Sequence, residues 1–242
     1  MPVPAPVPAE SQASDVAVVI PARNEADRIE ATVTAASGLA SVGLVVVVDD
    51  GSTDGTGAVA RRAGAVVLKH ARNRGKAAAM QAGATAVGLV DQRERRERPR
   101  HLLFLDADLA ESAAQAGPLA DPVLAGTADM TIAVFAATVK LGGHGLVVGL
   151  SGAGIRRAAG WRPAQPLNGQ RCLTRAAFEA ARPLARGWGV ETALTIDLLR
   201  RGFRVTEVEV ELAHRATGTG LRAQLHRAHQ LTDVARALAA RP

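Results

Sequence analysis

The chain has 242 residues, a formal net charge of +6 and a pI of about 10.8, with 48% hydrophobic and 21% charged residues. This composition is typical of a globular protein and excludes a mostly disordered chain. The longest apolar runs are far shorter than the ~20 residues of a membrane-spanning helix, so we expect no integral membrane protein. A single cysteine, Cys172, excludes an intrachain disulfide framework and fits a reducing cytoplasm.

The excess of basic residues predicts an anionic partner, such as phosphates, acidic lipid headgroups or nucleic acid. Aromatic residues make up only 2% of the chain, and tyrosine is absent. Because binding of single-stranded nucleic acid needs aromatic side chains on which bases stack, this composition argues against nucleic acid as the partner.

Residues 1–14 are rich in Pro and Ala, and we expect a disordered tail without a secretory signal. From residue 15 to 242, short apolar runs alternate with helical segments in what we interpret as one domain. Such a pattern indicates an α/β fold with a mostly parallel central sheet and helices on both faces. We expect strands at 16–20, 44–48, 65–68, 102–105, 130–136, 167–173 and 204–212, and helices at 26–36, 54–63, 75–89, 190–201 and 221–240.

Two further segments are less regular. The charge-dense stretch 91–100 is expected to form a solvated surface connection. Residues 146–159 fit either an amphipathic helix that lies on an anionic membrane or a flexible loop beside the acceptor. Three glycines in this stretch lower its helix propensity and favour the loop.

Polar residues follow each of the first four predicted strands. In open α/β sheets, ligands bind beyond the carboxyl ends of the strands, so these residues are candidates for a site. Dinucleotide-binding glycine turns, P-loops and nucleophile elbows are absent from the sequence. The candidate segments are Pro21-Ala22-Arg23-Asn24-Glu25, Asp49-Asp50-Gly51-Ser52-Thr53-Asp54-Gly55-Thr56, Asn73-Arg74-Gly75-Lys76 and Asp106-Ala107-Asp108.

Asp106 and Asp108 carry the sharpest chemical signal. Two carboxylates at i and i+2 after a buried strand can both reach one divalent cation, and carboxylate oxygens suit Mg²⁺ or Mn²⁺. The alternative is a solvated turn in which an aspartate caps the next helix. The position in line with the other strand ends favours the metal site.

Asp50 and Lys76 are the candidates on the other strands. A carboxylate at the end of the second strand can accept hydrogen bonds from a ribose or a base, while Asp54 is better placed to stabilise the next helix N-terminus. A lysine that opens an Ala-rich helix suits a phosphate, although a surface lysine is the simpler interpretation.

Glu191 and His214 are candidates in the second half of the chain. Glu191 follows Gly187-Trp188-Gly189, a pattern typical of a tight loop near a ligand, although it also fits a favourable contact with the helix dipole. His214 follows the last predicted strand and would complete a metal shell with Asp108, unless it is an ordinary surface histidine.

Together these residues resemble the GT-A glycosyltransferases. The series P-A-x-N-E, D-D-G-S-T-D-G-T, R-G-K and D-A-D, in this order, is similar to that of the large family-two group. The second half resembles the glucosyl-3-phosphoglycerate synthases and the polyprenyl-phosphate sugar transferases. The resemblance covers about residues 15–215 and implies a GT-A (Rossmann-like) fold. The motifs that carry it in the second half are residues 165–169, 187–191 and 213–215.

The resemblance implies a nucleotide-sugar donor, most often a UDP-sugar, and Mg²⁺ or Mn²⁺ as cofactor. The implied donor and metal contacts are Pro21, Ala22 and Glu25 with the uridine, Asp50 with the base or ribose, Lys76 with the uracil edge or phosphate, Asp106 with the ribose, and Asp108 with His214 at the metal.

On the acceptor side, the resemblance places Asn168, Gly169 and Gln170 along the acceptor and Glu191 near its hydroxyl group. Relatives have Ser-Gly-Glu or Ser-Gly-Gln at the first three positions, so the identity of the acceptor stays open. If the reaction inverts the sugar, Glu191 or a neighbour must accept the proton, whereas a retaining reaction needs no such base.

We therefore expect a cytoplasmic, metal-dependent glycosyltransferase that acts on a small phosphorylated acceptor or a polyprenyl phosphate. Peripheral contact with the inner membrane face and a homodimer stay open. A sugar-phosphate nucleotidyltransferase is the first alternative, but it needs a glycine-rich turn after the first strand, where this chain has Pro21-Ala22-Arg23. A non-catalytic nucleotide-binding module is the second alternative, and the presence of all four residues Asp106, Asp108, Glu191 and His214 argues against it.

Overall fold

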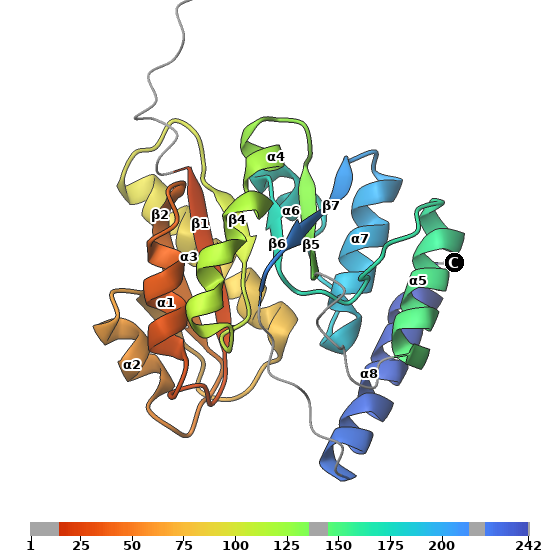
Figure 1. Cartoon of the computed structure of the whole chain (residues 1–242), viewed down its shortest axis with the longest axis horizontal. Coiled ribbons are helices and arrows are strands. Elements are labelled where there is room, and N and C mark those ends of the chain that lie inside the picture. Colours follow the sequence, from red (N-terminus) through yellow and green to blue (C-terminus); the bar gives the residue numbers. More distant parts are fainter. Residues whose placement is uncertain (1–14, 136–144, 213–220, 242) are drawn as a thin grey trace, which may run out of the picture.

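The computed structural model describes residues 15–135, 145–212 and 221–241, with only the helix backbone over 221–228. Its core is a seven-stranded sheet in the order β3-β2-β1-β4-β6-β5-β7 (Figure 1). Only β6 runs antiparallel to its neighbours, so the predicted mostly parallel sheet is confirmed. The strands are β1 (Val16–Ala22), β2 (Val42–Asp49), β3 (Val66–Lys69), β4 (His101–Phe104), β5 (Met130–Phe135), β6 (Arg171–Leu173) and β7 (Val205–Val210).

Helices cover both faces of the sheet (Figure 1). The α-helices are α1 (Ile29–Ser37), α2 (Thr56–Arg62), α3 (Lys76–Arg93), α4 (Asp121–Leu124), α5 (Gly145–Ala159), α6 (Arg175–Ala180), α7 (Val190–Arg200) and α8 (Leu221–Ala239), and the 3-10 helices are η2 (Ala110–Leu119) and η3 (Gly187–Gly189).

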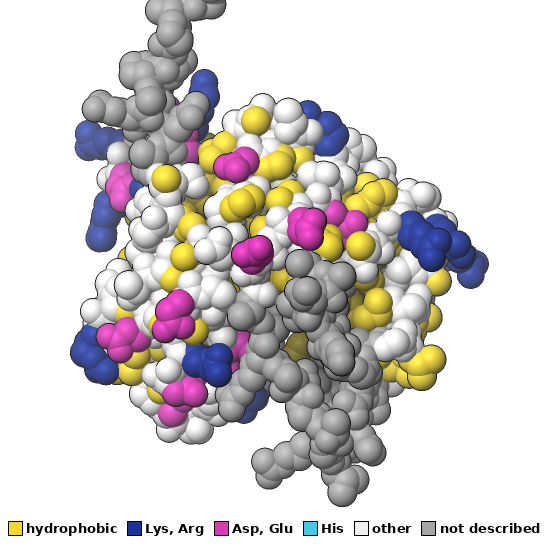
Figure 2. All heavy atoms as spheres, viewed as in Figure 1, with side chains coloured by type: hydrophobic (Ala, Val, Ile, Leu, Met, Phe, Trp, Pro, Cys, Tyr) yellow, Lys and Arg dark blue, Asp and Glu magenta, His cyan; other side chains and the backbone are white. Residues whose placement is uncertain are grey.

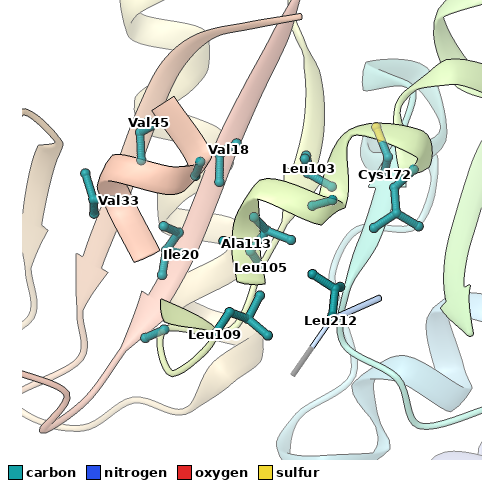
Figure 3. Close-up of a cluster of buried hydrophobic side chains, with 14 of the residues drawn as sticks. Val18, Ile20, Val33, Val45, Leu103, Leu105, Leu109, Ala113, Cys172 and Leu212 are labelled. Carbon is teal, nitrogen blue, oxygen red and sulfur yellow. The ribbon is translucent and has the colours of Figure 1, made fainter. Parts of the chain in front are cut away.

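Alternating side chains of β1 divide the core into two layers, because successive strand residues point to opposite faces. Val18 and Ile20 face a cluster that contains residues of α1, α2 and η2 (Figure 3). Val19 faces a second cluster that contains residues of α3, α6 and α7. On the face toward the viewer, acidic and basic side chains are interspersed with apolar ones (Figure 2).

The prediction of a solvated connection at 91–100 is confirmed for its middle, where residues 92–95 and 97–99 are exposed, and is wrong at its two ends. Helix α3 continues to Arg93, and Asp91 and Arg100 are buried at both ends of the stretch. The Arg100 guanidinium donates to the Asp91 carboxylate at 2.6 Å and to that of Glu94 at 2.6 Å. These ion pairs offset the cost of removing both charges from water. A count of charged residues does not reveal such pairing.

The preferred loop at 146–159 is also wrong, because this stretch is helix α5. One of its glycines has a packing role that outweighs its low helix propensity. A Cβ on Gly154 would lie 2.2 Å from Leu238 Cδ2 of α8, so the glycine permits the close approach of the two helices, which lie side by side in Figure 1. In the part of the chain that the structure describes, no helix is both long and apolar enough to cross a membrane.

The predicted strand at 167–173 is shorter, because only Arg171–Leu173 pairs with its neighbours. Phe104 and Ile132 lie opposite Arg171, and β6 runs antiparallel to β4 and β5. The residues that precede β6 therefore lie at the same edge of the sheet as those that follow the parallel strands. This orientation brings residues 165–170 to the predicted site.

Candidate active site

The turns after β1 and β2 are held together by side chains of the second turn. The backbone N–H groups of Asn24 and Glu25 donate to the hydroxyls of Ser52 and Thr56, at 3.0 and 2.9 Å. Asn24 has a φ of 56° and returns a bond, because its Oδ1 accepts from Thr53 N at 2.9 Å. These contacts delay the first helix, which begins at Ile29 instead of the predicted residue 26.

Asp54 serves the start of α2, as predicted. Its carboxylate accepts hydrogen bonds from Thr56 N and Ala26 N, at 2.9 and 3.2 Å. Desolvation opposes the effect, but a hydrogen bond from the Thr56 hydroxyl, together with these backbone bonds, lowers the pKa of Asp54. Pro21 and Ala22 end β1, and Ala22 O accepts from Asp50 N at 2.8 Å, so the predicted uridine-binding residues adjoin Asp50.

Asp50 is buried and organises the loop before α3. Its Oδ1 accepts from Arg74 N at 2.9 Å and lies 2.7 Å from His70 Nδ1, while its Oδ2 accepts from Gly75 N at 2.8 Å. His70 was not singled out from the sequence, although its place directly after β3 is a signal of the kind used for the other strands. The carboxylate of Asp50 thereby fixes the point where Lys76 begins its helix.

Lys76 joins both halves of the candidate site. Its ammonium lies 2.8 Å from Asp106 Oδ1 and 3.1 Å from Glu191 Oε1. Burial lowers the pKa of Lys76, but the charges of Asp106 and Glu191 outweigh burial and raise this pKa above its ordinary value, so the side chain stays a cation. The sequence predicts Lys76 beside the uracil or a phosphate; the structure places its ammonium between two carboxylates.

The predicted acceptor residues lie against the same group. Gln170 is fully buried, and its Nε2 donates to Asp106 Oδ2 at 2.7 Å. Asn168 Oδ1 accepts from Gln170 N at 3.0 Å. A Cβ on Gly169 would overlap Lys76 Nζ, so a larger residue at this position would require the ammonium to move. The structure therefore brings together Lys76, Asp106, Gly169, Gln170 and Glu191 from four segments of the chain.

Asp108 lies at the same strand end and is half-buried. Its backbone carbonyl accepts from Arg28, but within the described residues its carboxylate accepts no hydrogen bond and joins no ion pair. An unengaged carboxylate at this edge fits one ligand of Mg²⁺ or Mn²⁺. Over the described ranges, no group of three His, Cys, Asp or Glu side chains converges on a metal position, and His214 lies outside them.

Arg171 is the group that sequence reasoning missed. Its guanidinium is buried and donates to the backbone carbonyls of Pro166, Asn168 and Glu191, at 3.0, 2.7 and 3.0 Å. The sequence signal that could have found it is a charged residue, Arg171, at the first position of an otherwise apolar strand. Burial lowers the pKa of Arg171 to about 10, against the charges of Glu191 and Glu207, which raise it.

The Gly187-Trp188-Gly189 turn before Glu191 is packed under α8. Trp188 N donates to Asp233 Oδ2 at 3.1 Å, and a Cβ on Gly189 would lie 2.6 Å from that of Ala237. Gly187 has a φ of 67°, which favours glycine. The turn is therefore shaped by α8 and delivers Glu191 to the first turn of α7.

The sequence pattern of glycosyl transferase family 2 matches residues 17–144, more than half of the chain. The chain belongs to glycosyltransferase family 2. Its fold is the GT-A fold, as the resemblance implies.

Two curated relatives are similar to parts of the chain. Glycosyltransferase AglJ of Haloferax volcanii is 29% identical over 211 residues, which are 84% of this chain and 65% of AglJ. The uncharacterised protein MJ1222 of Methanocaldococcus jannaschii is 32% identical over 125 residues, which are 51% of this chain and 47% of that protein. The chain thus spans between about half and two thirds of the length of these relatives.

Solved structures of glucosyl-3-phosphoglycerate synthase from Mycobacterium tuberculosis are similar over most of the chain. The complex with phosphoglyceric acid is 25% identical with a TM-score of 0.73, over 93% of this chain and 80% of that one. The complex with Mn²⁺, UDP and phosphoglyceric acid is 26% identical with a TM-score of 0.74, over 93% and 78% of the two chains.

Proposed function

We propose that this glycosyltransferase moves a sugar from a UDP-sugar to a phosphorylated acceptor, with Mg²⁺ or Mn²⁺ as cofactor. The observation that carries the proposal is the contact of the Lys76 ammonium with both Asp106 and Glu191, which joins the donor-side turns to the acceptor-side segments. The similar synthase was solved with Mn²⁺, UDP and phosphoglyceric acid together, which supports this combination of ligands.

On the donor side, we propose that Pro21, Ala22 and Glu25 contact the uridine and that Asp50 accepts a hydrogen bond from the base or ribose. The Asp50 carboxylate is already held by His70, Arg74 and Gly75, and one lone pair of Oδ2 is left to accept. An acceptor that is fixed in advance costs little to order when the nucleotide binds.

Asp108 is proposed as a metal ligand, with His214 as the second. Leu212, two residues before His214 in the sequence, packs in the same buried cluster as Leu105 and Leu109, which supports this pairing (Figure 3). When bound, the metal would neutralise the charge that develops on the leaving diphosphate. Asp106 is proposed to bind the ribose while Lys76 and Gln170 hold its carboxylate in place.

On the acceptor side, we propose that Asn168, Gly169 and Gln170 line the acceptor and that Glu191 lies at its reacting hydroxyl. Lys76 keeps a positive charge beside the Glu191 carboxylate, which holds that carboxylate ready to accept a hydrogen bond from the hydroxyl. A hydroxyl that is oriented in this way meets the sugar with less loss of entropy.

The test is a screen for metal-dependent release of UDP. The chain is incubated with UDP-, GDP- or ADP-glucose and Mn²⁺, with 3-phosphoglycerate or a polyprenyl phosphate as the acceptor, and EDTA is added to matched samples. We expect release of UDP that needs both Mn²⁺ and a phosphorylated acceptor. In parallel samples with UTP and glucose 1-phosphate in place of the donor and acceptor, release of pyrophosphate would instead support a nucleotidyltransferase. UDP binding without turnover on any pair would support a binding module.

The two acceptor classes make different demands on the location of the protein. A polyprenyl-phosphate acceptor requires peripheral contact with the inner membrane face, whereas a small phosphorylated acceptor requires none. Co-sedimentation with anionic liposomes at physiological salt, with and without polyprenyl phosphate, distinguishes these two forms of the proposal.

A further inference from the structure

Arg171 makes its contacts in the buried interior beside the candidate site. It is 1% exposed, and its guanidinium donates to two carbonyls of the loop that precedes β6. On the other side it donates to Glu191 O at 3.0 Å and to Thr195 Oγ1 at 2.8 Å. One planar side chain thus binds both the acceptor loop, defined as residues 164–170, and the first turn of α7.

The acceptor loop is also held at its far end. Glu207 Oε1 of β7 accepts from Ala164 N and Gln165 N, at 2.7 and 3.1 Å. Thr195 hydroxyl donates back to Glu191 O at 2.9 Å, which ties the contact with Arg171 into the helix. The loop is therefore fixed between a carboxylate on one strand and a guanidinium on another, although it has no regular secondary structure.

The contacts of Arg171 are unusual for a buried cation. Among the described residues it forms no ion pair within 4 Å, and carbonyl and hydroxyl oxygens accept its hydrogen bonds. Burying a charge without a partner at this distance costs free energy that an apolar residue would not. Because a guanidinium presents its donors in a rigid fork, Arg171 fixes the spacing between the acceptor loop and Glu191.

We propose that Arg171 is a positioning residue that holds the acceptor loop and Glu191 in one arrangement around Asp106 and Lys76. This inference rests on the proposed function, since it assigns Arg171 to the acceptor side of the reaction. Arg171 acts through the backbone of Asn168 and Glu191, and it contributes neither a proton nor a contact with the sugar.

The test compares two buried threonines on the same helix. Thr195→Val removes the hydroxyl that Arg171 contacts, whereas Thr192→Val removes a hydroxyl that pairs with Ser151 Oγ at 2.7 Å. Both threonines are fully buried, and neither change alters the shape of the side chain. Thr195→Val loses the bonds to Arg171 and to Glu191 O, whereas Thr192→Val loses the single bond to Ser151. Arg171→Lys keeps the charge but loses the fork, and serves as a second variant.

The first measurement is amide hydrogen exchange over residues 164–170, followed by urea unfolding of each variant. We expect Thr195→Val and Arg171→Lys to accelerate exchange in the acceptor loop about tenfold, the loss of one net buried hydrogen bond. Thr192→Val should leave this exchange unchanged while it lowers the stability through the lost bond to Ser151. Equal exchange in the two threonine variants would overturn the proposal.

The second measurement is release of UDP from UDP-glucose with Mn²⁺ and 3-phosphoglycerate, together with calorimetric binding of UDP and Mn²⁺. We expect Thr195→Val to lower kcat about tenfold through misplacement of the reacting groups, with UDP affinity changed less than about twofold. A fall in kcat matched by Thr192→Val would contradict the inference. If the wild type releases no UDP, the proposed function fails, and the exchange comparison still decides whether Arg171 couples the two segments.

Discussion

The Lys76 ammonium lies between two carboxylates that reach it from different parts of the chain, and it is the residue on which the site depends most. In Lys76→Met, Asp106 and Glu191 face each other without a cation. We expect the unfolding free energy to fall by about 1–3 kcal/mol, the cost of unpaired polar groups, and metal-dependent UDP release to fall by about 10².

Lys69→Met is the matched control for this change, because Lys69 is an exposed lysine at the end of β3. It should stay within about 0.5 kcal/mol of the wild type and keep full activity. Urea denaturation and the UDP-release assay measure both variants. Equal effects of the two substitutions would mean that the contacts of Lys76 contribute nothing specific.

His101 predicts a pH dependence of stability. Burial lowers its pKa below 6.5, and the charge of Arg175 adds to this, while Asp15 opposes it. Because the unfolded chain then binds the proton more readily, stability is fully present above about pH 6.5 and declines as the pH falls through the lower, folded value.

The comparison variant for this pH dependence is His101→Leu, which also removes the buried Nδ1 that lacks a hydrogen-bond partner in the described structure. Urea unfolding is measured at about pH 7.5 and about pH 5.5 for both proteins. The wild type should lose more stability than His101→Leu over this interval. The same loss in both would show that other groups determine the acid sensitivity.

At the scale of elements, α8 is the part that shapes the turn before Glu191. Asp233→Ala removes the carboxylate that accepts from Trp188 N, so the turn loses its anchor. We expect a loss of about 1 kcal/mol in unfolding free energy and a fall in kcat, with a shift of Trp188 fluorescence toward longer wavelength.

The neighbouring Arg236→Ala provides the control, since Arg236 is 80% exposed and contacts the same carboxylate only at 3.4 Å. Its unfolding free energy should match that of the wild type within about 0.5 kcal/mol. Its kcat should equal that of the wild type. If Asp233→Ala behaves like Arg236→Ala, α8 does not control the turn.

Several elements were predictable from local pattern and others were not. Runs such as Leu44–Val48 are apolar on both faces, which only a covered parallel strand explains. The loop before β6 was predicted as part of a strand, but its backbone groups bond to the side chains of Arg171 and Glu207 instead of to a neighbouring strand. No local sequence pattern shows these contacts. The packing of Gly154 of α5 against Leu238 of α8 is likewise a tertiary contact that local helix propensity does not reveal.

Most residues of the candidate site could be predicted from the sequence, but the contacts between their side chains could not. Strand ends placed Asp50, Lys76 and Asp106 at one edge, because parallel strands end together. No sequence rule places the Lys76 ammonium between Asp106 and Glu191, since Asp106 is 30 residues and Glu191 is 115 residues further along the chain. The role of Arg171 depends on the antiparallel direction of β6, which the reading of parallel strands did not include.

At the scale of the whole molecule, Cys172 reports on global unfolding. It lies in the core between β4 and β5, and burial raises the pKa of its thiol to about 12 (Figure 3). A thiol reagent should therefore label it only when the fold opens. UDP with Mn²⁺ should slow labelling by stabilising the native state, and EDTA should abolish this slowing.

The labelling experiment has two informative controls. Urea-unfolded protein should react fully, and Mn²⁺ alone should slow the reaction less than Mn²⁺ with UDP. Fast labelling of the native protein would contradict the burial of Cys172, and equal rates with and without UDP would contradict a link between nucleotide binding and the fold.

The central claim is that Asp108, with His214, binds a divalent cation that in turn binds the diphosphate of a nucleotide sugar. Calorimetric titration of UDP tests this claim most directly. Wild type should bind UDP when Mn²⁺ is present, and Asp108→Asn should weaken this binding by at least about tenfold with an unchanged Tm. The exposed Asp27→Asn serves as control and should bind as the wild type does. Equal affinity of Asp108→Asn and wild type for UDP with Mn²⁺ would contradict the account.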